Sequence, residues 1–331
     1  LLFRVGLESN LHGLLDKLPA ATPIWIGNVV LSGIPAYFVS LYFLELGEIP
    51  SLFIAAALTA TSLAVSAEVW RESNALDSPN GETFVDVAEL DDLSGVALMA
   101  LLIAVAPVLR PGNGESALAA VMTALVIIVL KGAIFLALLY LAARYGEQYI
   151  SRILKKTMAP DSILLVVGIG LLISALASLA GFSIAIGGFF AGIIFSRDPE
   201  AVKLETLFLP LHSFFAPFFF IAIGLAIDPG SLASALSLGS VLLVIAIFGK
   251  VVGAGLPALM TTGSAGATLI GISMVPRAEI ALVIAQQGSI LGDWAVPAEV
   301  FSSIAMISIV TCLISPLGIR WIIRNFPKSL G

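Results

Sequence analysis

Two adjacent carboxylates, Asp91 and Asp92, stand at the start of a long apolar run in "VDVAELDDLSGVALMALLIAV", residues 85 to 105. Lys250 is equally isolated in "VLLVIAIFGKVVGAGLPALM", where apolar residues flank it on both sides. An ionisable side chain at the centre of a bilayer costs at least about 2.5–3.5 kcal/mol, so it normally faces a partner or a water-filled cavity. Lys250 is the natural counter-charge for one of the acids, and carboxylate oxygens suit hard cations such as Na⁺.

The adjacency of the two acids predicts that they have separate tasks. Consecutive residues on a helix point about 100° apart, so one carboxylate faces Lys250 while the other faces a cavity. The alternative is a structural salt bridge that sets the helix register, but such a bridge needs only one acid. The second acid at the same depth therefore favours a cation site, and the residues alone leave open which acid binds the cation.

Membrane-spanning helices must position these side chains. Hydrophobic residues make up 59% and charged residues 11% of the 331 positions, against roughly 45–50% and about 25% in soluble domains. A spanning helix needs about 20 apolar residues, which matches the spacing of the Gly, Pro and charge clusters. We therefore expect an all-α polytopic membrane protein of about 10–11 spans, namely the end of a helix at 1–20 and spans near 22–46, 50–72, 83–107, 115–143, 160–180, 183–196, 206–227, 236–259, 264–288 and 298–323.

The distribution of Lys and Arg supports these spans and predicts their orientation. If the spans alternate, one side of the membrane carries Lys17, Arg71, Arg144, Arg152, Lys155, Lys156, Arg197, Lys203, Arg320, Arg324 and Lys328. The other side carries Arg110 alone. The positive-inside rule makes the first side cytoplasmic, which places the C-terminus there and predicts the cell membrane as the location. The net charge of −6 hides this basic face, so no nucleic-acid partner is expected.

Two spans contain breaks at matching places. The breaking residues are Thr59, Thr61 and Ser62 in "AAALTATSLAVSAEVW", and Pro276, followed by Arg277 and Glu279, in "GISMVPRAEIALVIA". Proline removes a backbone donor and disfavours helix at the residue before it. Each broken span is the middle one of three, in 22–107 and in 236–323, which points to a binding site formed by inverted repeats. We expect Arg277 and Glu279 to pair with each other or to bridge neighbouring helices.

The other polar residues give weaker indications of function. Asp86, Glu89 and Asp92 recur every three residues along one helical face. They form either a funnel that attracts cations or a solvated helix start near an N-terminal dipole. The two histidines, His12 and His212, and the single cysteine, Cys312, have no partners at metal-ligand spacing, and no phosphate-binding glycine loop is present. No cofactor beyond transported Na⁺ and H⁺ is expected.

Seven stretches then resemble, in order, the signatures of the cation/proton antiporter superfamily. They are "LLFRVGLE", "LTATSLAVSAEVW", "AELDDLSGVALMALL", "GGFFAGIIFSRD", "FFAPFFFIAIGLAID", "FGKVVGAGLPAL" and "GISMVPRAEIALVIA". The set is most similar to the electrogenic sodium/proton antiporters with a double-aspartate motif. Two departures are Ala278 in "PRAE", where a glycine is usual, and Glu89, where an apolar residue is usual.

The resemblance implies an inverted-repeat transporter with two crossed, discontinuous helices. Its core would comprise 22–110 and 236–326, joined by a linker helix at 115–143 to dimerisation helices at 160–228 and 1–20, and the core would move like an elevator in a homodimer. The resemblance assigns Asp92 to the transported cation, Asp91 to Lys250, and Thr61 to the unwound crossing. The supporting residues would be Thr59, Ser62, Glu89, Arg277 and Glu279.

The expected function is therefore exchange of Na⁺ or Li⁺ for H⁺ across a lipid bilayer, without enzymatic chemistry. The nearest alternative is a K⁺/H⁺ antiporter of the same superfamily. An intramembrane aspartyl protease also buries two aspartates, but its acids come from separate helices so that they share one proton. A membrane sensor that transports nothing is the third alternative, and the complete set of two aspartates and one lysine argues against it.

Overall fold

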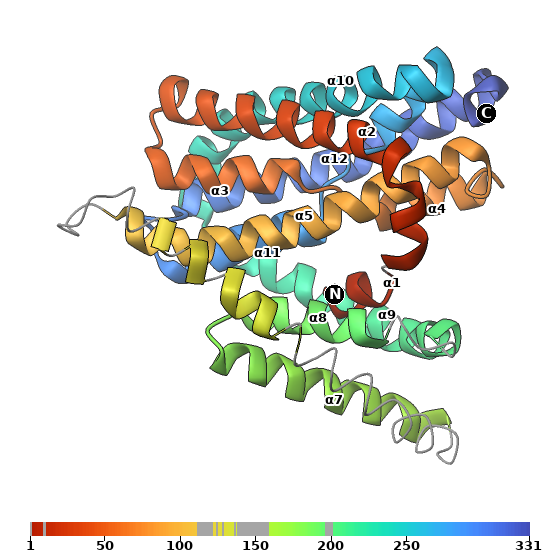
Figure 1. The fold of residues 1–331 in the computed structure, drawn as a ribbon. Coiled ribbons are helices and arrows are strands. Elements are labelled where there is room, and N and C mark those ends of the chain that lie inside the picture. Colours follow the sequence, from red (N-terminus) through yellow and green to blue (C-terminus); the bar gives the residue numbers. More distant parts are fainter. Residues whose placement is uncertain are drawn as a thin grey trace. The chain divides into compact units, whose positions relative to one another are not determined.

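The computed structural model describes residues 2–8, 11–110, 122–123, 125–127, 129–135, 137, 159–195 and 201–331, and its regular structure is helical (Figure 1). The described residues include five helices that are long and apolar enough to cross a membrane and five shorter apolar helices. Each of the ten predicted spans overlaps one of these helices. The chain is thus an all-α, multi-pass membrane protein, as its composition predicts. The predicted linker helix at 115–143 lies partly outside the described residues.

The chain divides into two compact units. Unit 1 comprises Leu1–Leu11 and Ala104–Ala222, and unit 2 comprises His12–Ile103 and Ile223–Gly331. All the candidate site residues belong to unit 2. The core and dimerisation roles that the resemblance implies for these parts of the chain stay predictions.

Unit 1 contains α1 (Leu2–Glu8), α7 (Ala159–Leu179), α8 (Ile184–Phe195) and most of α9 (Ala201–Leu225). Helices α1 and α8 approach through glycines, because a methyl group on Gly6 would lie 2.1 Å from the Phe189 carbonyl oxygen. A half-buried charge in α1 has a partner in this unit: the Arg4 guanidinium lies 3.3 Å from Nδ1 of His212. The sequence alone gave no indication that Arg4 and His212 lie together.

The first helical group of unit 2 begins earlier than predicted. Helix α2 (Leu11–Phe38) continues as a π-helical segment (Val39–Phe43), and α3 (Glu48–Thr59), α4 (Leu63–Glu72) and α5 (Pro79–Leu109) follow. Between α3 and α4 the backbone is extended, with ψ of 147° at Ala60 and 100° at Ser62. The predicted break in the span 50–72 is therefore confirmed.

The second group starts with a short 3₁₀ turn (Pro229–Ser231) and continues with α10 (Leu232–Ser273), α11 (Glu279–Leu291), α12 (Ala298–Asn325) and a final 3₁₀ turn (Pro327–Leu330). The predicted boundary between the spans 236–259 and 264–288 is confirmed, because α10 consists of two helical parts that meet at a kink. Helix α10 bends at Gly263, whose φ of 67° only glycine adopts without a steric penalty. The break at Pro276 is confirmed, since α10 ends at Ser273 and α11 starts at Glu279.

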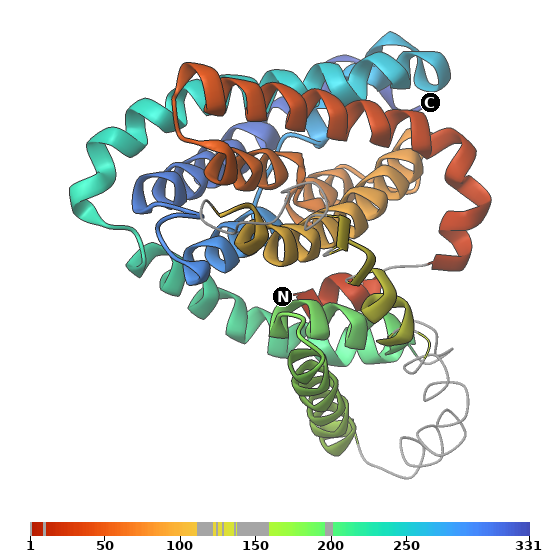
Figure 2. The ribbon, with the colours of Figure 1, turned by 60° about the vertical axis from the view of Figure 1, so that its left-hand side comes forward.

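Helices α2 and α10 run side by side in both views of the fold (Figures 1 and 2). Their backbones touch, since a methyl group on Gly27 would lie 2.4 Å from the Gly253 carbonyl oxygen and one on Gly249 would lie 2.6 Å from the Leu31 carbonyl oxygen. The breaks interrupt the middle span of each group. The inverted symmetry of the two groups stays a prediction. This close packing fixes α2 against the part of α10 that carries Lys250.

Candidate cation-binding site

The two helix breaks lie against each other at the centre of unit 2. The Ser62 backbone N–H donates to the Pro276 carbonyl oxygen at 2.7 Å, and the Thr61 hydroxyl donates to the Met274 carbonyl oxygen at 3.2 Å. One turn into α4, the Ser66 hydroxyl donates to the carbonyl of the last residue of α10, at 2.6 Å. The predicted crossing of two discontinuous helices is therefore present, and each break supplies part of the hydrogen bonding that the other lacks.

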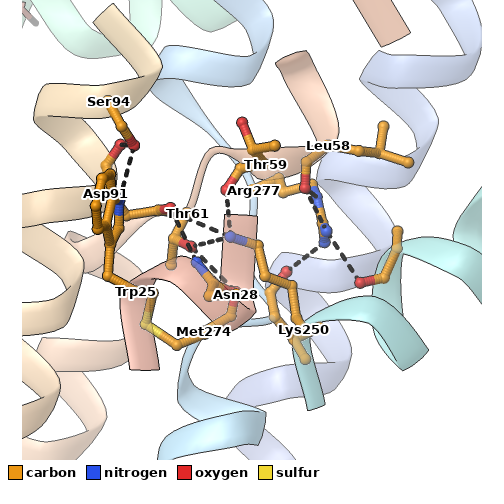
Figure 3. Close-up of polar contacts among 12 residues, drawn as sticks. Trp25, Asn28, Leu58, Thr59, Thr61, Asp91, Ser94, Lys250, Met274 and Arg277 are labelled. Atoms are coloured by element: carbon orange, nitrogen blue, oxygen red, sulfur yellow. Dashed lines mark hydrogen bonds and ion pairs between the residues drawn. The ribbon is translucent and has the colours of Figure 1, made fainter. Parts of the chain in front are cut away.

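Lys250 reaches the first break from α10. Its side chain is completely buried, and its ammonium donates to the Thr59 carbonyl oxygen, to Thr61 Oγ1 at 2.8 Å and to Asp91 Oδ2 at 3.1 Å (Figure 3). These three acceptors match the three donors of an ammonium group. Since Thr59 is the last residue of α3, Lys250 also caps the negative end of that helix.

Asp91 is held on both carboxylate oxygens. Oδ2 forms the buried ion pair with Lys250, and Oδ1 accepts a hydrogen bond of 2.9 Å from the side-chain amide of Asn28 in α2. Its backbone carbonyl accepts from the Ser94 hydroxyl at 2.9 Å, and Ser94 in turn accepts from the Trp25 indole N–H at 3.1 Å. The residues alone left open which acid pairs with Lys250, and the structure places Asp91 there.

Asp92, the next residue of α5, is 7% exposed. Its carboxylate lies within electrostatic range of Lys250, while the ion pair itself is formed by Asp91. One turn further on, Gly95 lies close to Ile280 and Ala60, so this part of α5 packs at the crossing. The structure thus brings a second buried carboxylate to the level of the breaks, on a different face of α5 from the paired one.

Arg277 departs from its expected pairing. The guanidinium is 1% exposed and donates to the carbonyl oxygens of Leu58 at 2.8 and 3.2 Å, Ala246 at 2.9 Å and Val275 at 2.9 Å. Among the contacts of the described residues, none joins Arg277 to Glu279, so the expected local ion pair is wrong and the expected bridge between helices is confirmed. Leu58 lies in the last turn of α3, where carbonyls lack helical donors, and the guanidinium supplies two N–H groups to its carbonyl oxygen.

Glu279 accepts instead from the Ser62 hydroxyl, at 2.9 Å. Ser62 directly precedes α4, and Glu279 is the first residue of α11. The N-terminal end of a helix is partly positive, so an acid shared by the starts of α4 and α11 is favourably placed. The crossing is therefore complementary in charge, with a carboxylate at the two helix starts and two cations at the end of α3.

This arrangement can be compared with known proteins. The chain matches the family described as "Sodium/hydrogen exchanger, transmembrane" over residues 1–325. The chain belongs to this exchanger family. Its members are transporters and not enzymes, which confirms that part of the prediction and removes the protease alternative.

Individual relatives agree with this assignment. The exchanger chain is 29% identical to the "High-affinity Na(+)/H(+) antiporter NhaS3" of Synechocystis, covering 99% of this chain and 70% of that protein. It is 28% identical to the "Na(+)/H(+)-K(+) antiporter GerN" of Bacillus cereus, covering 100% and 82%. Its fold resembles the sodium proton antiporter MjNhaP1 of Methanocaldococcus jannaschii, with a TM-score of 0.72, 15% identity, and coverage of 100% of this chain and 83% of that one.

The remaining predicted site residues of the exchanger are less central. Thr59 takes part through its backbone carbonyl, because its hydroxyl donates to Ala56 within α3, at 2.8 Å. Glu89 is half-buried on α5, one turn before Asp92, and its role as part of a funnel stays a prediction. The single cysteine, Cys312, donates to the Arg277 carbonyl oxygen at 3.2 Å.

Asn28 is the contact that sequence reasoning missed. It is completely buried, and it is the side chain of α2 that touches Asp91. The available signal was a lone amide in "IWIGNVVLSG", within an apolar span. Such amides commonly form hydrogen bonds between helices, so Asn28 would have been a candidate partner for the buried acids.

Proposed function

We propose that this exchanger transports Na⁺ or Li⁺ against H⁺ by competition for Asp92. Deprotonated Asp92 would bind the cation and protonated Asp92 would release it, so the two ligands use one site in turn. The observation that carries the proposal is the completely buried Lys250–Asp91 ion pair at the helix crossing, directly beside the second buried carboxylate. A purely structural ion pair would need Asp91 alone.

The contacts of Asp91 and Lys250 support a division of labour. Asp91 already receives donors on both oxygens, so a cation at Asp91 would compete with Lys250 and Asn28 for the carboxylate. In the proposed cycle the cation displaces Lys250, which then releases a proton as Asp92 does. Two protons would exchange for one Na⁺, and the net movement of one charge is worth roughly 2.3 kcal/mol per 100 mV.

The elevator mechanism and the homodimer are proposed from the resemblance. An elevator requires the whole site to move as one body, and the grouping of all the candidate residues in unit 2 supports this. The direction proposed for a cell membrane is Na⁺ out and H⁺ in, with the C-terminus in the cytoplasm. The lipid bilayer, protons and monovalent cations would be the partners.

K⁺/H⁺ exchange is the second candidate function. The name of the relative GerN, "Na(+)/H(+)-K(+) antiporter", joins K⁺ to Na⁺, and the match covers all of this chain. Carboxylate oxygens bind either ion, so selectivity depends on cavity size and ligand number rather than on the type of acid.

The test is exchange in proteoliposomes with a fluorescent pH indicator and Na⁺, Li⁺ or K⁺ as the added cation. We expect Na⁺ and Li⁺ to dissipate the pH gradient, and a membrane potential negative on the side that receives protons to accelerate exchange. A response to K⁺ alone would favour the second function, a rate independent of the potential would contradict the two-proton cycle, and no response to any of the three cations would overturn both.

A further inference from the structure

Asn28 connects a third helix to the ion pair at the crossing. Its side-chain N–H donates to Asp91 Oδ1 at 2.9 Å, while Lys250 holds Oδ2 at 3.1 Å (Figure 3). The two donors come from α2 and α10, and the carboxylate comes from α5. One acid is therefore oriented by two helices at once, and Asn28 lies in none of the stretches that carry the family resemblance.

The backbone leaves Asn28 little freedom to move away from this contact. A methyl group on Gly253 would lie 2.7 Å from the Gly27 carbonyl oxygen and 3.1 Å from Cα of Asn28, so α2 and α10 touch at this level. Lys250 lies three residues from Gly253, on the same stretch of α10. The glycine contact thus holds both donors of Asp91 in one geometry.

The orientation of the Asn28 amide is also determined by Asp91. A carboxylate only accepts hydrogen bonds, so the amide must turn its NH₂ group toward it. The Asn28 Oδ1 atom is buried and has no hydrogen-bond partner among the described residues, so no second contact competes for the amide. A buried amide whose only described hydrogen bond goes to the acid of an ion pair has the geometry of a positioning group.

We propose that Asn28 is a positioning residue that keeps the Asp91 carboxylate turned toward Lys250. This inference deepens the proposed function and rests on it. In that cycle the cation must displace Lys250 from Asp91, so every contact that strengthens the pair opposes cation binding and favours cation release. Asn28 therefore acts through Asp91 and not on the transported cation.

The consequence is a paired change in two kinetic constants. Asn28→Leu keeps the size of the side chain and removes the donor. The weakened Lys250–Asp91 pair opens more readily, so we expect the apparent KM for Na⁺ to fall about threefold to tenfold. This change is smaller than the full effect of one hydrogen bond to a charged group, because only part of that effect acts on the opening of the pair. The maximal rate should fall as well, because re-formation of the pair no longer drives release. A packing defect would lower the rate without lowering KM.

Ser32 provides the matched control, because it lies one turn further along α2. It is also completely buried, and its hydroxyl has no hydrogen-bond partner among the described residues. Ser32→Ala should leave both kinetic constants at the parent values. If Ser32→Ala changed KM as much as Asn28→Leu does, the effect would belong to the packing of α2 and the proposal would be overturned.

A thermal double-mutant cycle tests the contact without transport. The melting temperatures of Asn28→Ala, Asp91→Ala and their combination should be strongly non-additive, since Asn28 loses its contribution once the carboxylate is gone. If leucine does not fit at this position, Asn28→Ala takes the place of Asn28→Leu in the kinetic experiment. Additive melting temperatures, or an unchanged KM in an active Asn28 variant, would overturn the inference. If the parent exchanged no cation while the cycle was non-additive, the proposed function would fail and the positioning contact would stand.

Discussion

The break between α3 and α4 is stabilised by charged side chains. The carbonyl oxygens of Leu58 and Thr59, at the end of α3, accept hydrogen bonds from the guanidinium of Arg277 and the ammonium of Lys250. Both cations come from the second helical group, and both are buried. The partly negative end of a helix favours cations, so these charges stabilise the end of α3 more than neutral donors would.

The break between α10 and α11 receives mainly neutral groups, from the first break through Thr61, Ser62 and Ser66 and from α12. The Thr311 hydroxyl accepts from the Arg277 backbone N–H at 3.2 Å, and the Cys312 thiol donates to the Arg277 carbonyl oxygen at 3.2 Å. The Ser315 hydroxyl donates to the Ile272 carbonyl oxygen at 2.9 Å. These bonds replace the helical ones that Pro276 and its neighbours lack.

This difference in bonding suggests different roles for the two breaks. Transport can alter the bonds of the first break, whereas the neutral bonds from α12 keep the second break in one conformation. A charge-assisted bond responds when a cation or a proton changes the local charge, whereas a hydroxyl-to-carbonyl bond does not. The same Lys250 caps α3 and pairs with Asp91, so opening that ion pair would also affect the first break. The contacts that α12 makes with the second break, through Thr311, Cys312 and Ser315, involve neither Lys250 nor Asp91.

The largest effect on exchange is expected from Asp92→Asn. The asparagine amide has no negative charge to compensate a cation for its lost hydration shell, and it cannot bind and release the proton. Exchange should therefore be abolished. The melting temperature should stay close to that of the parent, because Lys250 keeps Asp91. Measurements of Na⁺-dependent pH-gradient dissipation and of thermal unfolding check both claims, and a near-normal rate in a well-expressed variant would contradict the site assignment.

Asp91→Asn should act on stability as well as on exchange. The change leaves the buried Lys250 without its carboxylate partner. Breaking a buried ion pair typically lowers the free energy of unfolding by roughly 3–5 kcal/mol. The loss should be somewhat smaller here, because the asparagine oxygen still accepts one hydrogen bond. We expect a clearly lower melting temperature and slower exchange. The double variant Asp91→Asn/Lys250→Met should regain part of the lost stability, because it no longer buries an unpaired charge. If Asp91→Asn melted at the same temperature as the parent, the ion pair would not stabilise the first break.

Arg277→Met tests the other cation at the first break. Removing the guanidinium leaves the Leu58, Ala246 and Val275 carbonyls with fewer donors, at about 1–3 kcal/mol for each buried group left unsatisfied. Exchange should slow less than in Asp91→Asn, since Arg277 touches neither acid in the structure. Arg277→Lys should restore little of the thermal stability, because one ammonium cannot reproduce the planar fork; full recovery would indicate that charge alone matters.

The smallest effect is expected from Thr311→Val at the second break. The change keeps the shape of the side chain. It removes the neutral hydrogen bond from the Arg277 backbone N–H and the two that the hydroxyl donates within α12, each worth about 0.5–1.5 kcal/mol. The melting temperature should fall slightly and the exchange rate should stay near the parent value, with Ser315→Ala as a companion variant. A loss of exchange as large as that of Arg277→Met would remove the distinction between the two breaks.

Several features could be predicted from local sequence because their causes lie in neighbouring residues. Apolar runs of spanning length predict the membrane helices, and Pro276 and the polar residues at 59–62 predict the breaks. The buried charges could be named because any ionisable residue in an apolar run is conspicuous. Local reasoning left two arrangements open for Arg277 and Glu279, a local pair or a bridge between helices, and only the crossing shows that the two residues contact different helix ends.

The chain by itself determined that the protein is a multi-pass membrane protein with broken helices, two adjacent acids and an isolated lysine. Only the tertiary structure decided that Asp91 meets Lys250, that Arg277 caps α3 and that Asn28 completes the hydrogen bonding of Asp91. Neither spacing nor composition determines these contacts, because they join residues between 63 and 219 positions apart. Their geometry depends on how closely the glycines of α2 and α10 let two backbones approach, and on which face of each helix turns inward once the breaks cross.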